Sequence, residues 1–134
     1  MASTIRLELV TPERFVLSED VDEVIVPGYE GELGILPEHT QYLSLVNIGV
    51  LRYRKGDDWR KIALGRGFAE VMPSQVVVLA DTAERAEEIN LERAKLAKER
   101  AEEAIRQAAS PEDEQYLQAE AALIRAINRI SAKN

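Results

Sequence analysis

The sequence contains no cysteine and only one histidine, His39. Without cysteine a disulfide framework and a thiolate metal site are excluded, and a single histidine excludes a poly-histidine metal site. No segment approaches the roughly 20 consecutive apolar residues that span a bilayer. The first residues, MASTIRLELVTP, also lack the charged and then apolar build of a signal peptide. These absences predict a cytosolic chain that holds no metal through such ligands.

Acidic residues outnumber basic ones by 24 to 17, which gives a formal net charge of −7. An excess of negative charge repels phosphate backbones and argues against nucleic acid as the main partner. The 134 residues are 46% hydrophobic and 31% charged, which is typical of a globular chain. This length suffices for one domain with its own core, or for a small core with an appendage.

Glycine, proline and aromatic residues are nearly absent from the second half of the chain. All seven glycines lie at or before Gly67, four of the five prolines lie at or before Pro73, and six of the seven aromatic residues precede residue 70. From about Ala83 the chain consists mainly of Ala, Glu, Arg and Lys. This break predicts a β-type half followed by an α-type half, with a boundary near residues 83–89.

The first half contains short apolar runs separated by turn residues. Ile5, Leu7 and Leu9 alternate with polar residues, which indicates a strand with one buried face. The segment RKGDDW, which follows Tyr53, is typical of a hairpin turn. Many short strands of this kind favour an antiparallel sandwich or a flattened barrel. Strands and helices do not alternate, and neither a Walker loop nor a GxGxxG motif is present, which argues against a nucleotide-binding α/β fold.

The second half predicts two helices with narrow apolar stripes. On the first helix the stripe consists of small side chains at spacings of three and four, namely Ala94, Ala97, Ala101, Ala104 and Ala108. On the second helix it comprises Tyr116, Ala119, Leu123, Ala126 or Ile127, and Ile130.

A short connection joins the two predicted helices, with Ser110 as the expected N-cap of the second and Pro111 in its first turn. Two striped helices with a short connection predict an antiparallel hairpin. An alanine stripe permits a close approach of the helices but buries little area, at roughly 25 cal/mol per Å². We therefore expect a weakly held hairpin that can open.

Charge is polarised along the second helix. Acidic residues occupy its start, whereas Arg125, Arg129 and Lys133 occupy its last turns. One interpretation is complementation of the helix dipole. The other is a basic tip that binds an anion or an acidic protein surface.

Five fragments, in order, resemble the epsilon subunit of bacterial F-type ATP synthase. They are EGELGILPEHT (30–40), GRGFAEV (65–71), VVVLADTAERAEEI (76–89), LERAKLAKERAEEAI (91–105) and ALIRAINRIS (122–131). The resemblance covers essentially the whole chain. It implies an α+β fold, with an N-terminal antiparallel β-sandwich over residues 1–85 and a C-terminal antiparallel two-helix hairpin over residues 86–134.

The resemblance also implies a function. Members of the family belong to the central rotor stalk and perform no chemistry alone; the sandwich binds the gamma subunit and, at one end, the membrane c-ring. The hairpin either folds against the sandwich or extends along gamma toward the alpha and beta subunits, which inhibits ATP hydrolysis. The expected location is the cytoplasmic face of the bacterial plasma membrane, with membrane contact only through the complex.

Two residues are implied at partner interfaces. Glu32, in the expected Gly31–Gly34 turn, would face the c-ring, and His39, in LPEHT, would face gamma. From sequence alone, the alternative is a solvated carboxylate and a surface-loop histidine without a special function.

Some members of the family bind ATP in the folded hairpin through a motif read as Ile/Leu-Asp-x-x-Arg-Ala. No cofactor is required, and ATP would be a regulatory ligand. Guanidinium groups suit phosphate oxygens, and Arg93 and Arg100 differ by about 700° of helix rotation, so that both lie on nearly one face. The residues implied by the resemblance are Glu84, Ile89, Asn90, Arg93, Ala94, Arg100, Arg125 and Arg129.

Asn90 departs from this motif, which carries Asp at that position; Asn keeps an acceptor oxygen, loses the charge and adds a donor. A competing interpretation is that the arginines pair with neighbouring acids on a solvated face, namely Glu88, Glu92, Glu99 and Glu102. An alternative function is a free-standing sandwich module whose hairpin docks another partner. No catalytic constellation is evident in the sequence.

Overall fold

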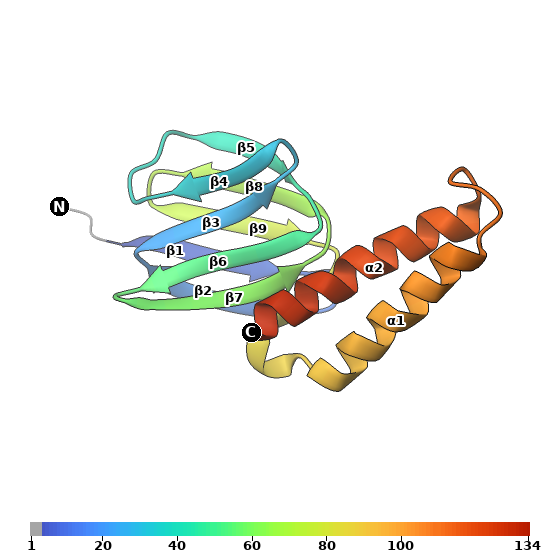
Figure 1. The fold of residues 1–134 in the computed structure, drawn as a ribbon. Coiled ribbons are helices and arrows are strands. Elements are labelled where there is room, and N and C mark those ends of the chain that lie inside the picture. Colours follow the sequence, from blue (N-terminus) through green and yellow to red (C-terminus); the bar gives the residue numbers. More distant parts are fainter. Residues whose placement is uncertain (1–3) are drawn as a thin grey trace.

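The computed structural model of the chain describes residues 4–134 and contains a β-sheet domain followed by two helices (Figure 1). Residues 1–3, which begin both the first predicted strand segment and the predicted sandwich, lie outside the described part. None of the helices within residues 4–134 is long and apolar enough to cross a membrane. The elements are β1 (Ile5–Val10), β2 (Phe15–Val21), β3 (Glu23–Gly28), β4 (Gly31–Ile35), β5 (Tyr42–Val46), β6 (Gly49–Lys55), β7 (Asp58–Leu64), β8 (Gly67–Met72), β9 (Gln75–Ala80), β10 (Ala83–Arg85), η1 (Ala86–Glu88), α1 (Leu91–Gln107) and α2 (Glu114–Lys133).

The ten strands form one sheet that folds over itself into a near-barrel sandwich. Its order is β10-β7-β6-β3-β5-β8-β9-β1-β2, with β4 paired to β3. Together with the two C-terminal helices, this arrangement confirms the α+β fold class. All strand pairs are antiparallel except β1 and β9, which pair in parallel. The sequence analysis did not predict this parallel pair.

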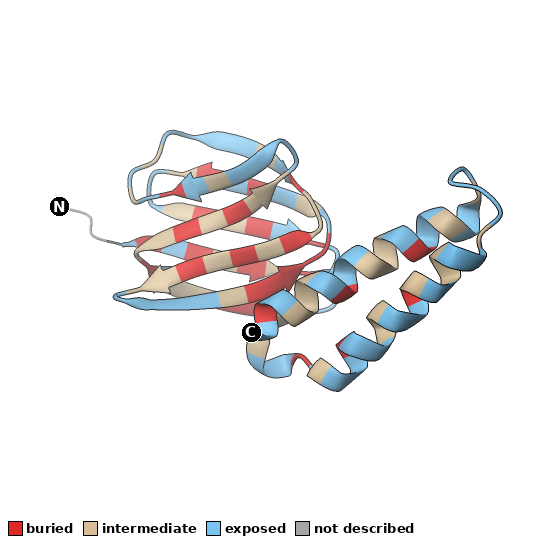
Figure 2. Cartoon of the chain, in the orientation of Figure 1, coloured by how far each residue is buried: buried red, intermediate tan, exposed pale blue. Residues whose placement is uncertain are grey.

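The core lies between the two layers of the sandwich (Figure 2). On β1 the predicted alternation is confirmed, because Ile5, Leu7 and Leu9 are each at most 1% exposed. Glu8 and Arg6 on the same strand do not join the core cluster. A period of two thus gives each strand one apolar face that the opposite layer covers.

One predicted turn is a strand in the structure. Gly31–Gly34 lies within β4, which pairs with β3 so that Gly28 is opposite Gly31. The reversal falls one step earlier, at Tyr29 and Glu30. Gly31 has a φ of 132°, which side chains rarely permit, and this conformation explains the glycine that leads out of the turn.

Both helices begin at a residue whose side chain accepts a backbone hydrogen bond. Oδ1 of Asn90 accepts from the amide of Arg93 at 3.1 Å and caps α1. Oδ1 of Asp113 accepts from the amide of Gln115 at 3.0 Å and caps α2. The prediction of Ser110 as the cap was wrong, because α2 begins after Asp113 rather than at Pro111.

The two helices pack as the predicted antiparallel hairpin (Figure 1). Only alanines are buried in this seam: Ala94 and Ala101 on α1, and Ala119 and Ala126 on α2. Ala126 is fully buried, whereas Ile127 is 45% exposed, so the first of the two predicted alternatives is correct. Small side chains bury little area, so this seam stabilises the closed hairpin only modestly.

The hairpin is attached to the sandwich by the C-terminal end of α2, and its connecting turn projects away (Figure 1). Ala132 is 3% exposed and packs with Ile89, which lies between η1 and α1, and with Ala63 of β7. Val50 of β6 covers this small cluster, which is separate from the main core. The hairpin thus docks through one end of one helix.

Candidate functional site

A groove of about 370 Å³ lies where β10 and η1 meet α1 and α2. It is the setting for most of the residues that were predicted to bind ATP. Its lining residues are Glu84, Glu88, Asn90, Arg93, Ala94, Leu96, Ala97, Arg100 and Arg129. Six of the eight predicted residues therefore lie on one surface, although they come from β10, α1 and α2.

Arg93 and Arg100 contribute positive charge from α1. Both line the groove, as expected for residues seven positions apart on a helix. Within residues 4–134, neither arginine forms an ion pair, and Glu92, Glu99 and Glu102 form none either. The competing interpretation, in which neighbouring acids neutralise these arginines, is not supported.

Arg129 enters the groove from α2 and meets Glu84 from β10. Its Nε lies 2.5 Å from Oε1 of Glu84, and each side chain is about one-third exposed. This pair links α2 to the sandwich, and among residues 4–134 only the Nε of the Arg129 guanidinium has a side-chain hydrogen-bond partner. A bound anion would therefore meet Arg129 in competition with a carboxylate.

Asn90 has a structural function that Asp would also perform. Its side-chain oxygen is engaged by the Arg93 amide, and Asp and Asn are equally good N-caps. The departure from the motif thus preserves the start of α1. Ile89 lies beneath the groove rather than in its lining, packed against Ala63 and Ala132.

The eighth predicted residue, Arg125, is exposed on α2 and does not line the groove. Conversely, three lining residues were missed: Glu88, Leu96 and Ala97. Leu96 and Ala97 lie three and four positions after Arg93, so helical spacing could have identified them. The competing interpretation counted Glu88 among the acids that pair with the candidate arginines, but Glu88 lies in η1 and pairs with Arg14.

The Glu88 carboxylate accepts three hydrogen bonds. Two come from the guanidinium of Arg14, at 2.7 and 2.9 Å, and one comes from the amide of Arg85, at 3.0 Å. The Arg14 hydrogen bonds are the main cause that lowers the pKa of Glu88 below its ordinary value, against an opposing effect of partial burial. The Glu88 carboxylate in the groove therefore stays ionised to a lower pH than the carboxylate of an isolated glutamate.

The groove suits a ligand that carries negative charge and an apolar ring. Arginines line one part of it, and Leu96, Ala94 and Ala97 provide apolar surface. Within residues 4–134, no group of three or more His, Asp or Glu side chains is arranged to hold a metal ion. No side-chain arrangement in the groove provides a nucleophile with an adjacent base.

The two predicted interface residues lie outside the groove. Glu32 on β4 is not a solitary carboxylate, because both its oxygens accept from Nη2 of Arg52, at 3.0 and 2.8 Å. His39 follows β4, and its Nδ1 lies 2.7 Å from the carbonyl oxygen of Thr40.

A row of exposed apolar side chains crosses the outer face of the sandwich and was not predicted. Along the register of β5, β8, β9, β1 and β2, Leu45 pairs with Phe68, Phe68 with Leu79, Leu79 with Val10, and Val10 with Phe15. Leu45, Phe68, Leu79 and Phe15 are 52%, 51%, 51% and 59% exposed. We call these five residues the apolar row. Contiguous exposed apolar surface of this kind marks protein interfaces.

Comparison with known proteins adds independent information. Residues 4–86 match the family described as ATP synthase, Delta/Epsilon chain, beta-sandwich domain, and residues 87–134 match the corresponding long alpha-helix domain. The ATP synthase epsilon chain of Desulforamulus reducens is 52% identical over 98% of both chains, and that of Syntrophobacter fumaroxidans is 51% identical over 97% of this chain and 96% of its own.

Among solved structures, a chain of the Euglena gracilis mitochondrial ATP synthase (OSCP/F1/c-ring, rotational state 1) has a TM-score of 0.84 and 26% identity. The match covers 100% of this chain and 84% of that one. ATP synthase epsilon chains are a structural and regulatory subunit rather than the catalytic one, which confirms that the chain is not itself an enzyme. The resemblance seen in the five sequence fragments is likewise confirmed, and the chain belongs to the ATP synthase delta/epsilon chain family.

Proposed function

We propose that this chain is a subunit of the central rotor stalk of a proton-translocating F-type ATP synthase. The sandwich binds the gamma subunit and the c-ring, and the hairpin inhibits ATP hydrolysis when it extends toward the alpha and beta subunits. The similar Euglena chain is part of an assembly that contains F1 and a c-ring, which supports these partners. Such a subunit lies on the cytoplasmic face of the bacterial plasma membrane and reaches the membrane only through the complex.

The apolar row gives the sandwich a surface for gamma. Its four most exposed side chains are aromatic or leucine, and all lie on hydrogen-bonded strands of the sheet. Hydrophobic anchors on a rigid surface are the usual centre of a protein interface. Glu32 and His39 stay as proposed contacts of the sandwich with the c-ring and with gamma.

The observation that carries the inhibitory proposal is the one-ended attachment of the hairpin. Its contacts with the sandwich are concentrated in the last turns of α2, and the seam between the helices contains only buried alanines. A small free-energy difference therefore separates the docked hairpin from a released one. A partner that binds the released helices can shift this equilibrium by its differential affinity.

ATP is the proposed ligand of the closed hairpin. Arg93, Arg100 and Arg129 would bind its phosphates, because guanidinium groups offer paired donors to phosphate oxygens. The base or ribose would lie against Ala94 and Asn90. Since the lining comes from both helices and from β10, a bound nucleotide would stabilise the docked hairpin and relieve inhibition. Arg125 joins this set only if its side chain turns toward the groove.

Removal of residues 86–134 tests the inhibitory function. We expect faster ATP hydrolysis by the assembled complex, with co-purification of the shortened chain and gamma as the control for assembly. Equal hydrolysis with the complete and the shortened chain, measured at low ATP where the extended hairpin is favoured, would refute inhibition. Calorimetric titration of the complete isolated chain with ATP tests the ligand, and no heat up to millimolar ATP would refute it.

A further inference from the structure

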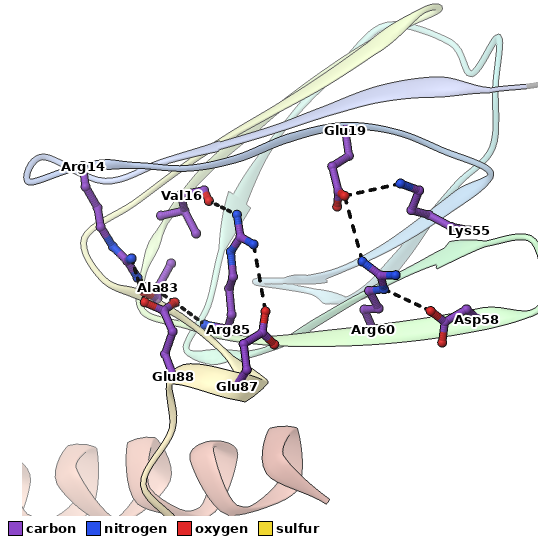
Figure 3. A network of polar contacts seen from close by, with 10 residues as sticks. All are labelled: Arg14, Val16, Glu19, Lys55, Asp58, Arg60, Ala83, Arg85, Glu87 and Glu88. Carbon is purple, nitrogen blue, oxygen red and sulfur yellow. Dashed lines mark hydrogen bonds and ion pairs between the residues drawn. The ribbon is translucent and has the colours of Figure 1, made fainter.

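One arginine of the sandwich holds both ends of the segment that leads to the hairpin. Arg14 lies between β1 and β2, and its Nη2 donates to the carbonyl oxygen of Ala83 at 3.0 Å (Figure 3). The same guanidinium binds both carboxylate oxygens of Glu88, at 2.7 and 2.9 Å. A planar guanidinium that makes two parallel bonds to a carboxylate restricts its orientation more than a single contact does. We call residues 83–88 the linker.

A second arginine, Arg85 of the linker, contacts the sandwich. Arg85 extends from the linker and donates to the carbonyl oxygen of Val16 on β2 (Figure 3). Its amide donates to Oε1 of Glu88, which ties the short η1 turn together. The linker is thus bound to the β1–β2 region by one side chain from each segment, Arg14 of the β1–β2 connection and Arg85 of the linker. The pairing of β10 with β7 holds it in addition.

The contacts change character immediately after Glu88. Ile89 packs against Ala132, which belongs to α2, as well as against Ala63 of the sandwich. Asn90 caps α1 through the Arg93 amide. Up to Glu88 the chain is bound by side chains of the sandwich, with further contacts from Arg129 and Lys133 of α2, whereas Asn90 is the first residue bound to α1.

We propose that Arg14 is a positioning residue that keeps the linker on the sandwich when the hairpin moves, so that the pivot is Ile89–Asn90. Glu84 and Glu88 then form a fixed wall of the groove, to which α1 and α2 return. This differs from the boundary at residues 85 and 86 that the sequence suggested. The consequence for ATP rests on the proposed function, but the position of the pivot does not.

A preformed wall lowers the entropic cost of closing the groove. If the linker were free in the released state, a ligand would have to order it together with both helices. Because Arg14 orders it beforehand, the ligand orders the helices alone. Loss of Arg14 should therefore lower the affinity of the closed hairpin for any ligand of the groove. It would do so without removing a ligand contact, since Arg14 does not line the groove.

The first test releases the hairpin in the complete chain by Ala132→Glu, which introduces a charge between Ile89 and Ala63. Backbone ¹⁵N relaxation then reports which residues tumble with each part. We expect the amides of 85–88 to follow the sandwich and those from Leu91 onward to follow the helices. Arg129→Ala combined with Lys133→Ala, which removes polar contacts of α2 with Glu84 and Ala86, is the second releasing variant. If the amides of residues 85–88 show the relaxation rates of the helices rather than those of the sandwich, the proposal is overturned.

The second test compares Arg14→Gln with Arg6→Gln. Arg6 is the matched control, because it lies on β1 and its guanidinium forms an exposed ion pair with Asp20, at 3.2 Å, rather than with residues 83–88. For Arg14→Gln we expect faster hydrogen exchange of the Arg85 amide by about threefold or more, and a rise in the pKa of Glu88 toward its ordinary value. Arg14→Lys should restore both in part, and Arg6→Gln should change neither.

An ATP titration of the same variants separates this proposal from the proposed function. We expect Arg14→Gln to lower the affinity for ATP about threefold and Arg6→Gln to leave that affinity unchanged. If the unmodified chain binds no ATP, the proposed ligand fails, and the relaxation and exchange results alone decide the position of the pivot. Identical exchange at Arg85 in Arg14→Gln and Arg6→Gln would overturn the positioning function of Arg14, whatever the ATP result.

Discussion

Arg129 and Glu84, which are 45 residues apart in the sequence, form an ion pair across the junction of α2 and β10, with Nε and Oε1 2.5 Å apart. The pair joins the sandwich to the hairpin, and under the proposed function it would break when the hairpin is released. It also lies in the groove proposed for ATP, so that the guanidinium that docks α2 would also contact the proposed ligand.

The energy of this pair should be small. Because both side chains are about one-third exposed, we expect a coupling of about 0.5–1 kcal/mol in a double-mutant cycle of Glu84→Gln and Arg129→Gln. Native-state hydrogen exchange of α2 amides provides the measurement. Effects of the two substitutions that simply add would contradict a direct interaction in solution.

Arg100→Ala should weaken ATP binding by about tenfold or more, because a charge-assisted hydrogen bond to phosphate is lost from a groove that no acid neutralises at this position. Arg106→Ala is the matched control, since Arg106 lies on the same helix but pairs with Glu103 outside the groove. Calorimetry on both variants decides. Equal affinities would show that Arg100 is only a solvated charge.

Asn90→Ala should shorten or destabilise α1 by about 1 kcal/mol, because the Arg93 amide loses its capping acceptor. Asn90→Asp should retain helix stability, since both side chains cap equally well. Circular dichroism during thermal unfolding measures the difference. With the cap thus controlled, a change in ATP affinity in Asn90→Asp reports the added charge and the lost amide donor rather than a change at the helix start; equal unfolding of all three proteins would argue against the cap.

Phe68→Glu should weaken binding of gamma by tenfold or more, because it introduces a charge into the apolar row between Leu45 and Leu79. Trp59→Glu is the control, as Trp59 is similarly exposed (44%) but lies on β7, away from the row. Co-purification and titration with gamma test both. An equal loss in the two variants would indicate that another surface binds gamma.

A chain ending at Glu88 should unfold cooperatively, at a midpoint about 4 °C above that of a chain ending at Glu84, because only the longer chain retains the carboxylate that Arg14 binds. Calorimetric scans compare the two. The core of the sandwich contains residues no later than Ala83, so we expect both to remain folded. Loss of cooperative unfolding in both chains would refute an independent sandwich.

Local patterns were sufficient to predict the two-part architecture. The alternation at Ile5, Leu7 and Leu9 is confirmed. The alanine spacing on α1 is confirmed for Ala94 and Ala101, which are buried, whereas Ala108 lies beyond the end of the helix at Gln107. Helical spacing placed Arg93 and Arg100 on one face, and both line the groove, whereas the candidate set as a whole came from the family resemblance. These predictions depended only on residues that are neighbours within their own element.

Contacts between distant segments were not predictable in the same way. Nothing in the residues near Glu88 indicates that Arg14 would bind it, because that contact depends on how β1, β2 and β10 are brought together. The apolar row has the same origin, since its members are single exposed residues that become one surface only through strand register. The error at Ser110 was local: two residues in the connection compete as caps, and Asp113 is the one at the start of α2.

The parallel pairing of β1 with β9 has a consequence for the synthesis of the chain. β1 is made first, yet one of its two neighbours, Gln75–Ala80, leaves the ribosome only when more than half of the chain has been translated. The layer that contains β1 therefore stays open on one side during most of translation, and pairing over such long sequence separations is slow. We expect nascent chains in which β9 has not emerged from the ribosome to be sensitive to protease, and chains in which all residues through Ala83 have emerged to become resistant while the helices are still being completed.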